Sequence, residues 1–566
     1  MEQRKQNYLT GAATLSIAII VVKVIGMLYK IPLKHLIDDA SFGYFNTAYD
    51  IYSALLVVAS TGLPVALSRM ISEAQALGRT RQVQRIFRTA LVAYISVGVL
   101  GSGLMVLFPK WLAGTVMHNP NAFYAILVLG PSVLFICIAS ACRGYFQGHG
   151  DMRPTAVSQI IEAASKLVLG LLFAWLVIRS TTDGALAAGA TIGGVTVGSL
   201  LSAVYLTVRY RRNRSRRDPL AGEADSFGAT AKKLVSIALP ITLGAMSLQL
   251  INLLDSSTLM GRIVSAAEQT PEGAHNIVGT LLAIARQNPP TLEPGQELTH
   301  AVLSQHAADT AKGIYNFAQT IFNFPIAFIP CITSAIIPAI SANLAVKDES
   351  GVRKVQNSSM RLMSLIALPC AVGLFVLAEP IMAILGGYSG TKLELASLLM
   401  ALLAPTVVVS SITTMLIATL QAHDHMVIPV INTLIGSALK VVVNYILVGN
   451  PNIAILGGPI STFLCLTVVM ILDLIAVHRL LRQPPKLLAP LCRAGLAAIL
   501  MGAAAWLCYY GLRHFGMGTT LSFGAALLLA VALYAVLAIR LRVILREDCL
   551  LLPKGEKLAK LLHIRA

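Results

Sequence analysis

The chain has 566 residues, of which 56% are hydrophobic and only 12% are charged, and its mean hydropathy is +0.73. A soluble protein of this length needs far more charge to cover its surface, so the composition excludes a soluble multi-domain protein and indicates a chain that faces lipid. The formal net charge is +18, but the basic residues gather in short breaks between apolar segments, most densely in the arginines between 209 and 217. This pattern is typical of loops beside an anionic membrane leaflet and argues against nucleic acid as a partner.

A helix needs about 20 apolar residues to cross the hydrocarbon core of a bilayer. The first apolar run contains Lys23, continues to about Tyr29 and lacks a small-residue cleavage site, so it predicts a retained first span rather than a signal peptide. By the same measure the sequence predicts roughly fourteen spans. They are expected at residues 10–34, 44–68, 86–108, 121–147, 154–178, 184–208, 231–259, 312–343, 359–386, 393–420, 427–449, 454–478, 487–511 and 519–543.

The loops between these spans alternate in charge. Basic residues follow the second, sixth, eighth and twelfth spans and fill the C-terminal tail, whereas loops such as 116–121 and 449–453 are nearly uncharged. The positive-inside rule therefore predicts that both termini lie in the cytoplasm. The stretch 261–311 is expected to be a long outer loop, which either separates two lobes or forms a disordered tether.

An internal repeat divides the chain. The segment 144–170 resembles 418–444 at a constant offset of 274 positions. Since six spans separate the copies, the repeat is parallel and predicts two lobes related by an axis along the membrane normal. Identical pairs at this offset include Gln147 and Gln421, His149 and His423, Met152 and Met426, and Lys166 and Lys440. We expect an N-lobe at 1–208, a basic linker at 209–230, a C-lobe at 231–480 and a C-terminal helix pair with a basic tail at 481–566.

Ionisable residues inside spans cost roughly 2.5–3.5 kcal/mol each on insertion scales, so those present are candidates for function. Lys23 and Lys30 lie seven residues apart, on one stripe of the first helix, and would suit an anionic group; alternatively Lys30 extends to the outer interface. Lys166 follows Glu162 by four residues, an order that favours an intrahelical ion pair; alternatively Lys166 is a further substrate-binding cation. Lys440 has Gly436 at the corresponding position, so its anion must come from another helix or from a substrate.

Two acidic residues within spans, Asp50 and Asp255, are candidates for binding a coupling proton or Na⁺, or for pairing with Lys23. The repeated turns contain a third set of candidates, expected to end helices and form gate contacts on the inner side: Arg143, Gln147, Asp151, Gln421 and Asp424.

No chemistry of a catalytic kind is predicted. The sequence has no phosphate-binding loop, no HExxH motif and no nucleophile elbow, so neither an enzyme nor a cofactor is expected. The histidines and acids of the two repeated turns, which belong to separate lobes, make a weak case for a metal site, and none is expected. The cysteines lie in apolar segments or on the predicted cytoplasmic side, where disulfides are not expected.

The stretch from Arg143 to Glu162, RGYFQGHGDMRPTAVSQIIE, resembles the SpoVB/YtgP branch of polysaccharide exporters. Further matching stretches are KVIGMLYKIP from Lys23, TGLPVALSR from Thr61 and LPITLG from Leu239. This branch belongs to the MOP flippase superfamily together with the lipid II flippase MurJ and the MATE drug exporters. MurJ carries arginines in its first spans where this chain has Lys23 and Lys30 or, in another alignment, Tyr29.

The resemblance implies an all-α integral membrane protein of about fourteen helices, in which two pseudo-symmetric six-helix lobes are followed by a helix pair. It implies a flippase that moves an undecaprenyl-pyrophosphate-linked sugar across the cytoplasmic membrane by alternating access. The partners expected are the lipid-linked oligosaccharide, membrane lipids and a coupling Na⁺ or H⁺, with the protein acting as a monomer. Two alternatives stay open, a cation-coupled drug exporter and a non-transporting scaffold that binds a soluble partner through the arginines of 209–217.

Overall fold

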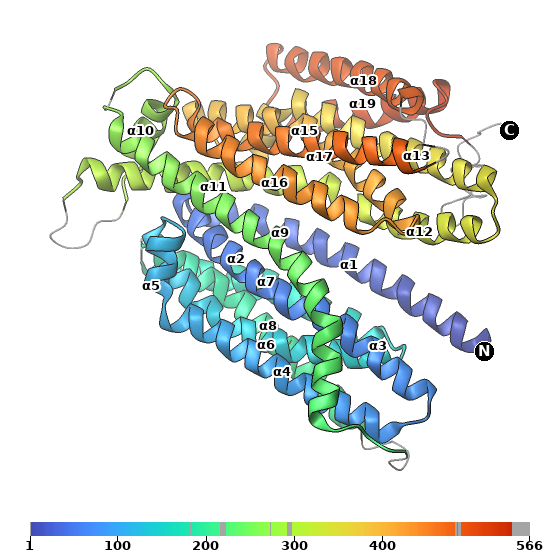
Figure 1. Ribbon diagram of the computed structural model, residues 1–566. Helices are drawn as coiled ribbons and strands as arrows, with labels where there is room; N and C mark the ends of the chain where they lie inside the picture. Colours follow the sequence, from blue (N-terminus) through green and yellow to red (C-terminus); the bar gives the residue numbers. More distant parts are fainter. Residues whose placement is uncertain are drawn as a thin grey trace. The chain divides into compact units, whose positions relative to one another are not determined.

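The computed structural model describes residues 2–181, 183–214, 222–271, 273–290, 297–481, 484 and 488–545. Side chains are described in the same ranges, except at 2–17, 214, 244, 248, 330–332, 334, 335 and 338. Part of the arginine-rich segment 209–217 and the basic tail beyond residue 545 therefore lie outside the described residues. The described chain is helical apart from short connections (Figure 1), as the hydropathy pattern predicts.

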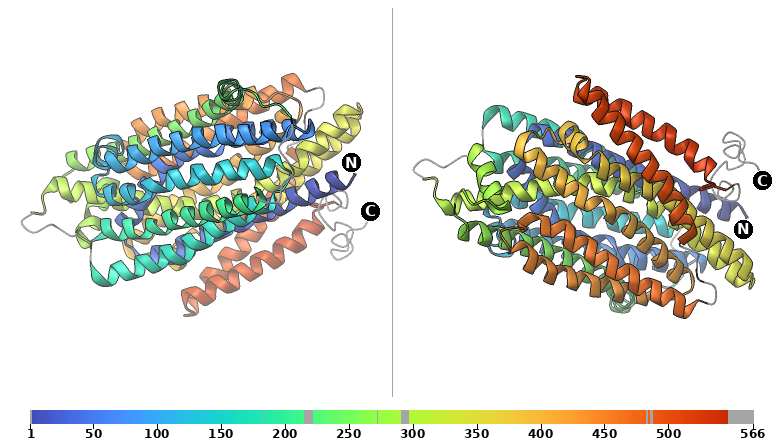
Figure 2. Two further views of the ribbon diagram at one scale, coloured as in Figure 1. Left: turned by 90° about the horizontal axis from the view of Figure 1, so that it is seen from below. Right: turned by 90° about the horizontal axis from the view of Figure 1, so that it is seen from above.

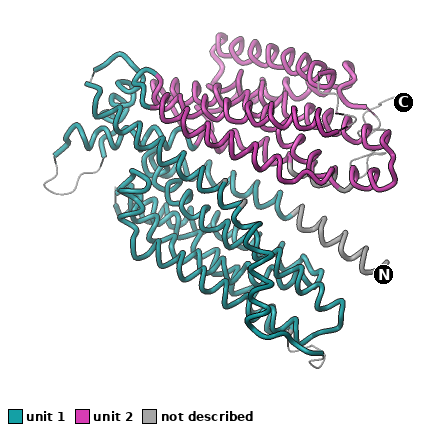
Figure 3. The backbone as a smooth tube through the Cα atoms, in the orientation of Figure 1, with its two compact units in different colours: residues 1–316, 449–452 teal, residues 317–448, 453–566 magenta. Residues whose placement is uncertain are grey.

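The chain divides into two compact units, coloured separately in Figure 3. Unit 1 comprises residues 1–316 and 449–452, and unit 2 comprises 317–448 and 453–566. Unit 1 holds α1 (Glu2–Leu36), α2 (Asp39–Ser60), α3 (Gly62–Ala76), α4 (Thr80–Leu107), α5 (Pro109–Trp111), α6 (Phe123–Gly148), α7 (Arg153–Ser180), α8 (Gly184–Arg214), α9 (Phe227–Gln269), α10 (Ile277–Gln287) and the first part of α11 (His300–Ile326). Unit 2 holds the rest of α11 and α12 (Ile329–Ala345), α13 (Glu349–Val376), α14 (Ala378–Gly386), α15 (Gly390–Ala422), α16 (Val427–Val448), α17 (Gly457–Leu480), α18 (Leu488–His514) and α19 (Thr519–Arg540).

Twelve helices among the described residues are long and apolar enough to cross a membrane. The other two predicted spans correspond to α1, whose first side chains lie outside the described set, and to the pair α11 and α12. The predicted eighth span is interrupted at residues 327–328, because Pro325 lies near the end of α11 and a second proline begins α12. The approximate count of fourteen spans is thus compatible with the structure.

The predicted outer loop 261–311 is wrong as a description of local structure. Helix α9 continues to Gln269, α10 covers Ile277–Gln287, and α11 begins at His300. The hydropathy measure missed α10 and the start of α11 because these helices carry polar residues on one face; in α10 the apolar side chains Val278, Leu281 and Leu282 are buried.

In unit 1, α6 packs against α2, α3, α4 and α8, and α7 packs against α1 and α8. In Figure 2 α4, α6 and α8 run side by side, as the contacts require. In unit 2, α15 packs against α12, α13, α14 and α17, and α16 packs against α17. The α6–α7–α8 group and the α15–α16–α17 group therefore repeat the same three-helix arrangement.

The C-terminal helices α18 and α19 pack against each other, and α18 packs on α13 within unit 2. Small residues allow the close approach, with Ala494, Ala497 and Ala538 forming a buried cluster beside Leu365 and Leu368. The hydroxyl of Tyr534 also donates a hydrogen bond to the carbonyl of Leu365 at 3.0 Å.

Candidate functional site

Lys166 on α7 lies in an aromatic cage contributed by α1 and α2. Its ammonium is 4.5 Å from the ring centroid of Tyr49, 5.2 Å from that of Tyr29 and 6.0 Å from that of Phe45, and it donates a 3.4 Å hydrogen bond to the Tyr49 hydroxyl. No carboxylate among the described residues forms an ion pair with it. The rings attract the cation without neutralising it, and such contacts contribute about 0.5–2 kcal/mol each.

Lys30 brings a second cation to the same part of unit 1. Its ammonium donates a hydrogen bond to Asn46 Oδ1 at 3.2 Å, lies 5.8 Å from the centroid of the Phe42 ring, and is close enough to repel that of Lys166. The alternative that Lys30 extends to the outer interface receives no support from these contacts. Lys23, seven residues earlier on α1, is exposed, and no described residue hydrogen-bonds to it. Of the two lysines predicted on this stripe, Lys30 therefore belongs to the cluster.

The predicted ion pair between Glu162 and Lys166 is not formed. The Glu162 carboxylate instead accepts a 2.9 Å contact from Arg143 on α6. Arg143 also donates to the hydroxyls of Ser158 on α7 and Ser202 on α8, each at 3.1 Å. Arg143 thus joins three helices instead of forming part of the turn, and the long interhelical reach of its guanidinium explains why spacing along one helix predicted the wrong partner.

Asp50 on α2 pairs with a residue that the sequence patterns did not select, Lys312 on α11. The Lys312 ammonium is 3.7 Å from Asp50 Oδ2 and donates to Thr47 Oγ1 at 2.9 Å, and the Ser256 hydroxyl of α9 donates to Asp50 at 2.6 Å. The predicted pairing of Asp50 with Lys23 is therefore wrong. Asp255, on α9, is buried and contributes to the negative surroundings of Lys312.

One turn of α11 before Lys312, the carboxylate of Asp309 is fully buried. It accepts hydrogen bonds from Gln305 at 3.2 Å and Asn121 at 3.5 Å, and Asn121 also donates to the Tyr44 hydroxyl at 3.2 Å. The spacing of Asp309 and Lys312 on one helix could have revealed both residues, but residues up to 311 were assigned to a loop. A correct helix boundary would have supplied the missing signal.

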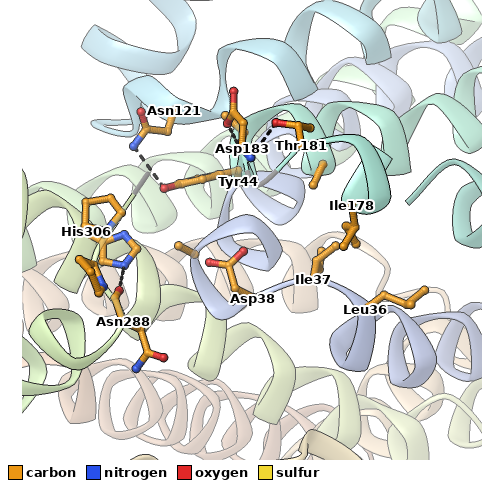
Figure 4. Close-up of a pocket in the computed structure, with 16 residues that line it drawn as sticks. Leu36, Ile37, Asp38, Tyr44, Asn121, Ile178, Thr181, Asp183, Asn288 and His306 are labelled. Carbon is orange, nitrogen blue, oxygen red and sulfur yellow. Dashed lines mark hydrogen bonds between the residues drawn. The ribbon is translucent and has the colours of Figure 1, made fainter. Parts of the chain in front are cut away.

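A cavity of about 390 Å³ lies beside this network in unit 1 (Figure 4). Asp38 and Asp183 supply its acidic groups, while Tyr44, Asn121 and His306 supply further polar groups. The Asp183 carboxylate is engaged by the backbone amide of Ala185 at the start of α8, at 2.8 Å. The described residues of the lining include two carboxylates and neither lysine nor arginine, which makes this cavity unsuitable for a diphosphate, in contrast to the Lys30 and Lys166 cluster.

In unit 2, Lys440 is half-buried on α16. Gly436, four residues earlier, is buried against α17, where an added Cβ would lie 2.3 Å from Val469 Cγ2 and 3.1 Å from the Cys465 carbonyl oxygen. The absence of an acid at this position, noted from the repeat, therefore has a steric cause.

The repeated turns end α6 and α15 in the same way. The backbone carbonyl of Gln147 accepts a 2.9 Å hydrogen bond from the backbone amide of Gly150. The backbone carbonyl of Gln421 likewise accepts a 3.2 Å hydrogen bond from the backbone amide of Asp424. Gly150 and Asp424 both adopt positive φ, 77° and 64°. Asp424 thus corresponds to Gly150, whereas the Asp151 side chain accepts a 3.1 Å hydrogen bond from the amide of Arg153, the first residue of α7. These contacts agree with helix-ending roles; a gating role stays a prediction.

The turn histidines bind back to their own helices. His149 Nδ1 lies 2.9 Å from the Tyr145 carbonyl oxygen, and His423 Nδ1 lies 2.8 Å from that of Thr419. Burial lowers the pKa of His149 below its ordinary value of 6.5, and the negative charge of Asp151 offsets part of this effect.

The fold and the intramembrane charges together define the class: an α-helical, multi-pass membrane protein with the fold of MurJ and MATE proteins. A solved structure titled "Lipid II flippase MurJ, inward closed conformation" matches with a TM-score of 0.68 and 13% identity, covering 93% of this chain and 98% of that one. An inward-facing MATE family transporter of the MOP superfamily matches with a TM-score of 0.58 and 14% identity, covering 81% of this chain and 97% of that one.

The polysaccharide biosynthesis protein family model matches residues 8–344, more than half of the sequence, and the chain belongs to this family. A second model, the lipid II flippase MurJ family, matches residues 296–534. Among proteins of Bacillus subtilis (strain 168), the chain is 24% identical to stage V sporulation protein B, over 84% of this chain and 85% of that protein. It is 22% identical to lipid II flippase MurJ, over 77% and 76%, and 23% identical to the membrane protein YabM, over 98% and 96%.

Proposed function

We propose that the protein is a flippase that moves an undecaprenyl-pyrophosphate-linked sugar, such as lipid II or a related wall precursor, across the cytoplasmic membrane by alternating access. Family membership and the fold support a lipid-linked precursor as the class of cargo. The finer assignment rests on the chemistry of the Lys30 and Lys166 cluster.

The observation that carries the proposal is the Lys166 ammonium, which is surrounded by rings and forms no ion pair with a carboxylate of the described residues; the nearest negative charge acting on it is Glu162, which is itself paired with Arg143. A charge inside a membrane protein costs roughly 2.5–3.5 kcal/mol on insertion scales, and the aromatic contacts offset only part of that cost. A diphosphate would supply the missing negative charge. Lys30 would provide a second contact, and the prenyl chain would remain in lipid.

Both termini lie in the cytoplasm in this proposal. An inside-negative potential then contributes about 2.3 kcal/mol per charge per 100 mV to outward movement of an anionic head group. The same potential favours inward return of an empty cationic site, so a cycle needs neither ATP nor catalysis. Coupling to H⁺ or Na⁺ would add to this force. The protein acts as a monomer, since each chain contains a complete cluster.

A cation-coupled drug exporter shares the fold, but an organic cation would be repelled by Lys30 and Lys166. A non-transporting scaffold would leave the caged lysine without a use. Among the three classes, the cluster favours an anionic cargo.

The test is complementation of a bacterial strain depleted of its own lipid-linked precursor flippases. Lys166→Gln and Lys30→Gln keep polar side chains but remove the charges, and we expect both to lose complementation at normal membrane abundance. Lys233→Gln serves as the matched control, because Lys233 is an exposed lysine paired with Glu73 at 3.1 Å. Full complementation by a Lys30→Gln, Lys166→Gln double variant would remove the basis of the proposal.

A further inference from the structure

Asp473 is a fully buried acid of unit 2, on the membrane-spanning helix α17. Its Oδ1 accepts a 2.8 Å hydrogen bond from the Asn432 amide of α16, whose side chain is also buried. Its Oδ2 is buried as well, and no described residue donates a hydrogen bond to it. One oxygen of the carboxyl group is therefore hydrogen-bonded, and the other is buried without a hydrogen-bond partner among the described residues.

The corresponding junction of unit 1 contains its own cation. At the repeat offset of 274, Arg143 corresponds to Ile417 and Glu162 to Gly436, while Ser158 corresponds to Asn432. The α6–α7–α8 junction thus holds an arginine with its acid, whereas the α15–α16–α17 junction has Ile417 in place of the arginine and holds an acid contributed by α17. The second junction has a negative group without the cation that accompanies the first.

No other charged side chain among the described residues replaces that cation. On α17, His478 is exposed and its ring binds the Leu474 carbonyl oxygen at 3.0 Å. On α15, the ring of His423 is engaged by its own helix. On α16, Lys440 lies eight residues beyond Asn432, about 12 Å along the helix axis. None of these residues forms an ion pair with Asp473.

An ionised carboxylate buried without a cation costs several kcal/mol, and protonation removes that cost. A proton needs a single oxygen, whereas Na⁺ needs several oxygen ligands around it. The side chains of Asp473 and Asn432 provide too few oxygen ligands for Na⁺. We propose that Asp473, positioned by Asn432, is a proton-binding site of unit 2 that is occupied by a neutral carboxylic acid and can exchange its proton.

The carboxyl group would exchange its proton with water at the C-terminal end of α17. The helix ends at Leu480, seven residues after Asp473, so Asp473 lies about 10 Å from that end along the helix axis. If the chain is the proposed flippase, this site gives unit 2 a proton that can be bound and released during a transport cycle. Protonation itself does not depend on the proposed function.

Infrared difference spectroscopy of the full-length protein in lipid tests the site directly. Wild-type protein should show the carbonyl absorption of a protonated carboxylic acid at mildly acidic pH, and the absorption should disappear on raising the pH. Asp473→Asn should lack it. Asp424→Asn, which changes an exposed acid in the neighbouring turn, should retain it. Absence of the band from the wild type, or its persistence in Asp473→Asn, would overturn the proposal.

Two further arms keep the test decisive. Asp473→Glu retains the acid, so a shifted band in this variant assigns the absorption even if Asp473→Asn does not fold. Loss of the wild-type band on adding Na⁺ at constant pH would identify a sodium site instead and overturn the proton assignment. In transport-competent liposomes Asp473→Asn should abolish the pH dependence of the rate; liposomes without transport would count against the flippase proposal while leaving the infrared result standing.

Discussion

The α6–α7–α8 junction of unit 1 and the α15–α16–α17 junction of unit 2 derive from one repeated sequence, yet they hold their polar groups differently. In unit 1, Arg143 and Glu162 form an ion pair that is partly accessible, with 13% and 25% of their side chains exposed. In unit 2, Asp473 is fully buried with an amide as its partner. The repeat therefore preserves helix packing and turn geometry while the charge at the junction changes.

The two junctions differ at both partner positions. Gly436 stands where unit 1 has Glu162 and packs closely on α17, and Ile417 stands where unit 1 has Arg143. A junction with only one of the two partners would hold a buried charge without compensation, whereas a junction with neither avoids the desolvation cost together with the attraction.

The largest effect is expected from breaking the first junction. Arg143→Ile alone should destabilise the protein by about 3 kcal/mol, because Glu162 is left without its cation. The double variant Arg143→Ile, Glu162→Gly copies unit 2 and should recover much of that loss. Unfolding in detergent, followed as a double-mutant cycle, measures the coupling. Additive effects of the two substitutions would show that the pair does not act as a unit.

The α15–α16–α17 junction should not tolerate a glutamate at position 436, which corresponds to Glu162 of unit 1. Gly436→Glu is expected to cost about 2 kcal/mol or more, since even a Cβ meets Val469 at 2.3 Å. Gly373→Ala is the matched control, because nothing lies within 4 Å of an added Cβ there, and it should leave stability unchanged or raise it. The measurement is the yield of monodisperse protein and its thermal unfolding temperature. Equal behaviour of the two variants would contradict the steric explanation.

The turns provide a smaller, reciprocal test. Gly150 has φ of 77°, so Gly150→Ala should cost about 1 kcal/mol. Asp424 has φ of 64° at the corresponding position, and Asp424→Gly should raise stability by a few tenths of a kcal/mol to about 1 kcal/mol. Thermal unfolding of the two variants should shift in opposite directions. Shifts of the same sign would argue against equivalent turns.

The smallest expected effect is a pH dependence. Burial lowers the pKa of His149, so the unfolded chain binds its proton more readily than the folded protein. The contribution of His149 is fully present above its ordinary pKa of 6.5 and is lost as the pH falls through the lowered folded value. His149→Gln should flatten the acid limb of a stability–pH curve by less than about 1 kcal/mol. An unchanged acid limb would contradict the assignment.

Much of the fold could be predicted from the sequence, because bilayer thickness fixes the length of a span and the repeat has a constant offset. The boundaries failed where polarity concealed a helix, as at α10 and the start of α11. The interruption between α11 and α12 follows from prolines, but hydropathy averages over it.

The site was predicted less well, for a physical reason. Sequence spacing identifies neighbours along one helix, so it paired Glu162 with Lys166; it cannot show that Arg143 approaches from α6 or that Lys312 approaches Asp50. The aromatic cage around Lys166 combines Tyr29 of α1 with Phe45 and Tyr49 of α2, and no pattern within one segment reveals it. Lobe boundaries and the role of Lys440 stay predictions.

The central claim is that a cationic cluster in unit 1 carries a lipid-linked diphosphate across the membrane. The direct measurement is the movement of a fluorescent undecaprenyl-pyrophosphate-linked sugar between leaflets of liposomes containing the purified protein, with and without an imposed potential. The account predicts movement by the wild type and by Lys233→Gln, faster movement when the potential favours the anionic head group, and loss of movement in Lys166→Gln. Equal rates for the wild type and Lys166→Gln, or no movement by well-folded wild-type protein, would contradict it.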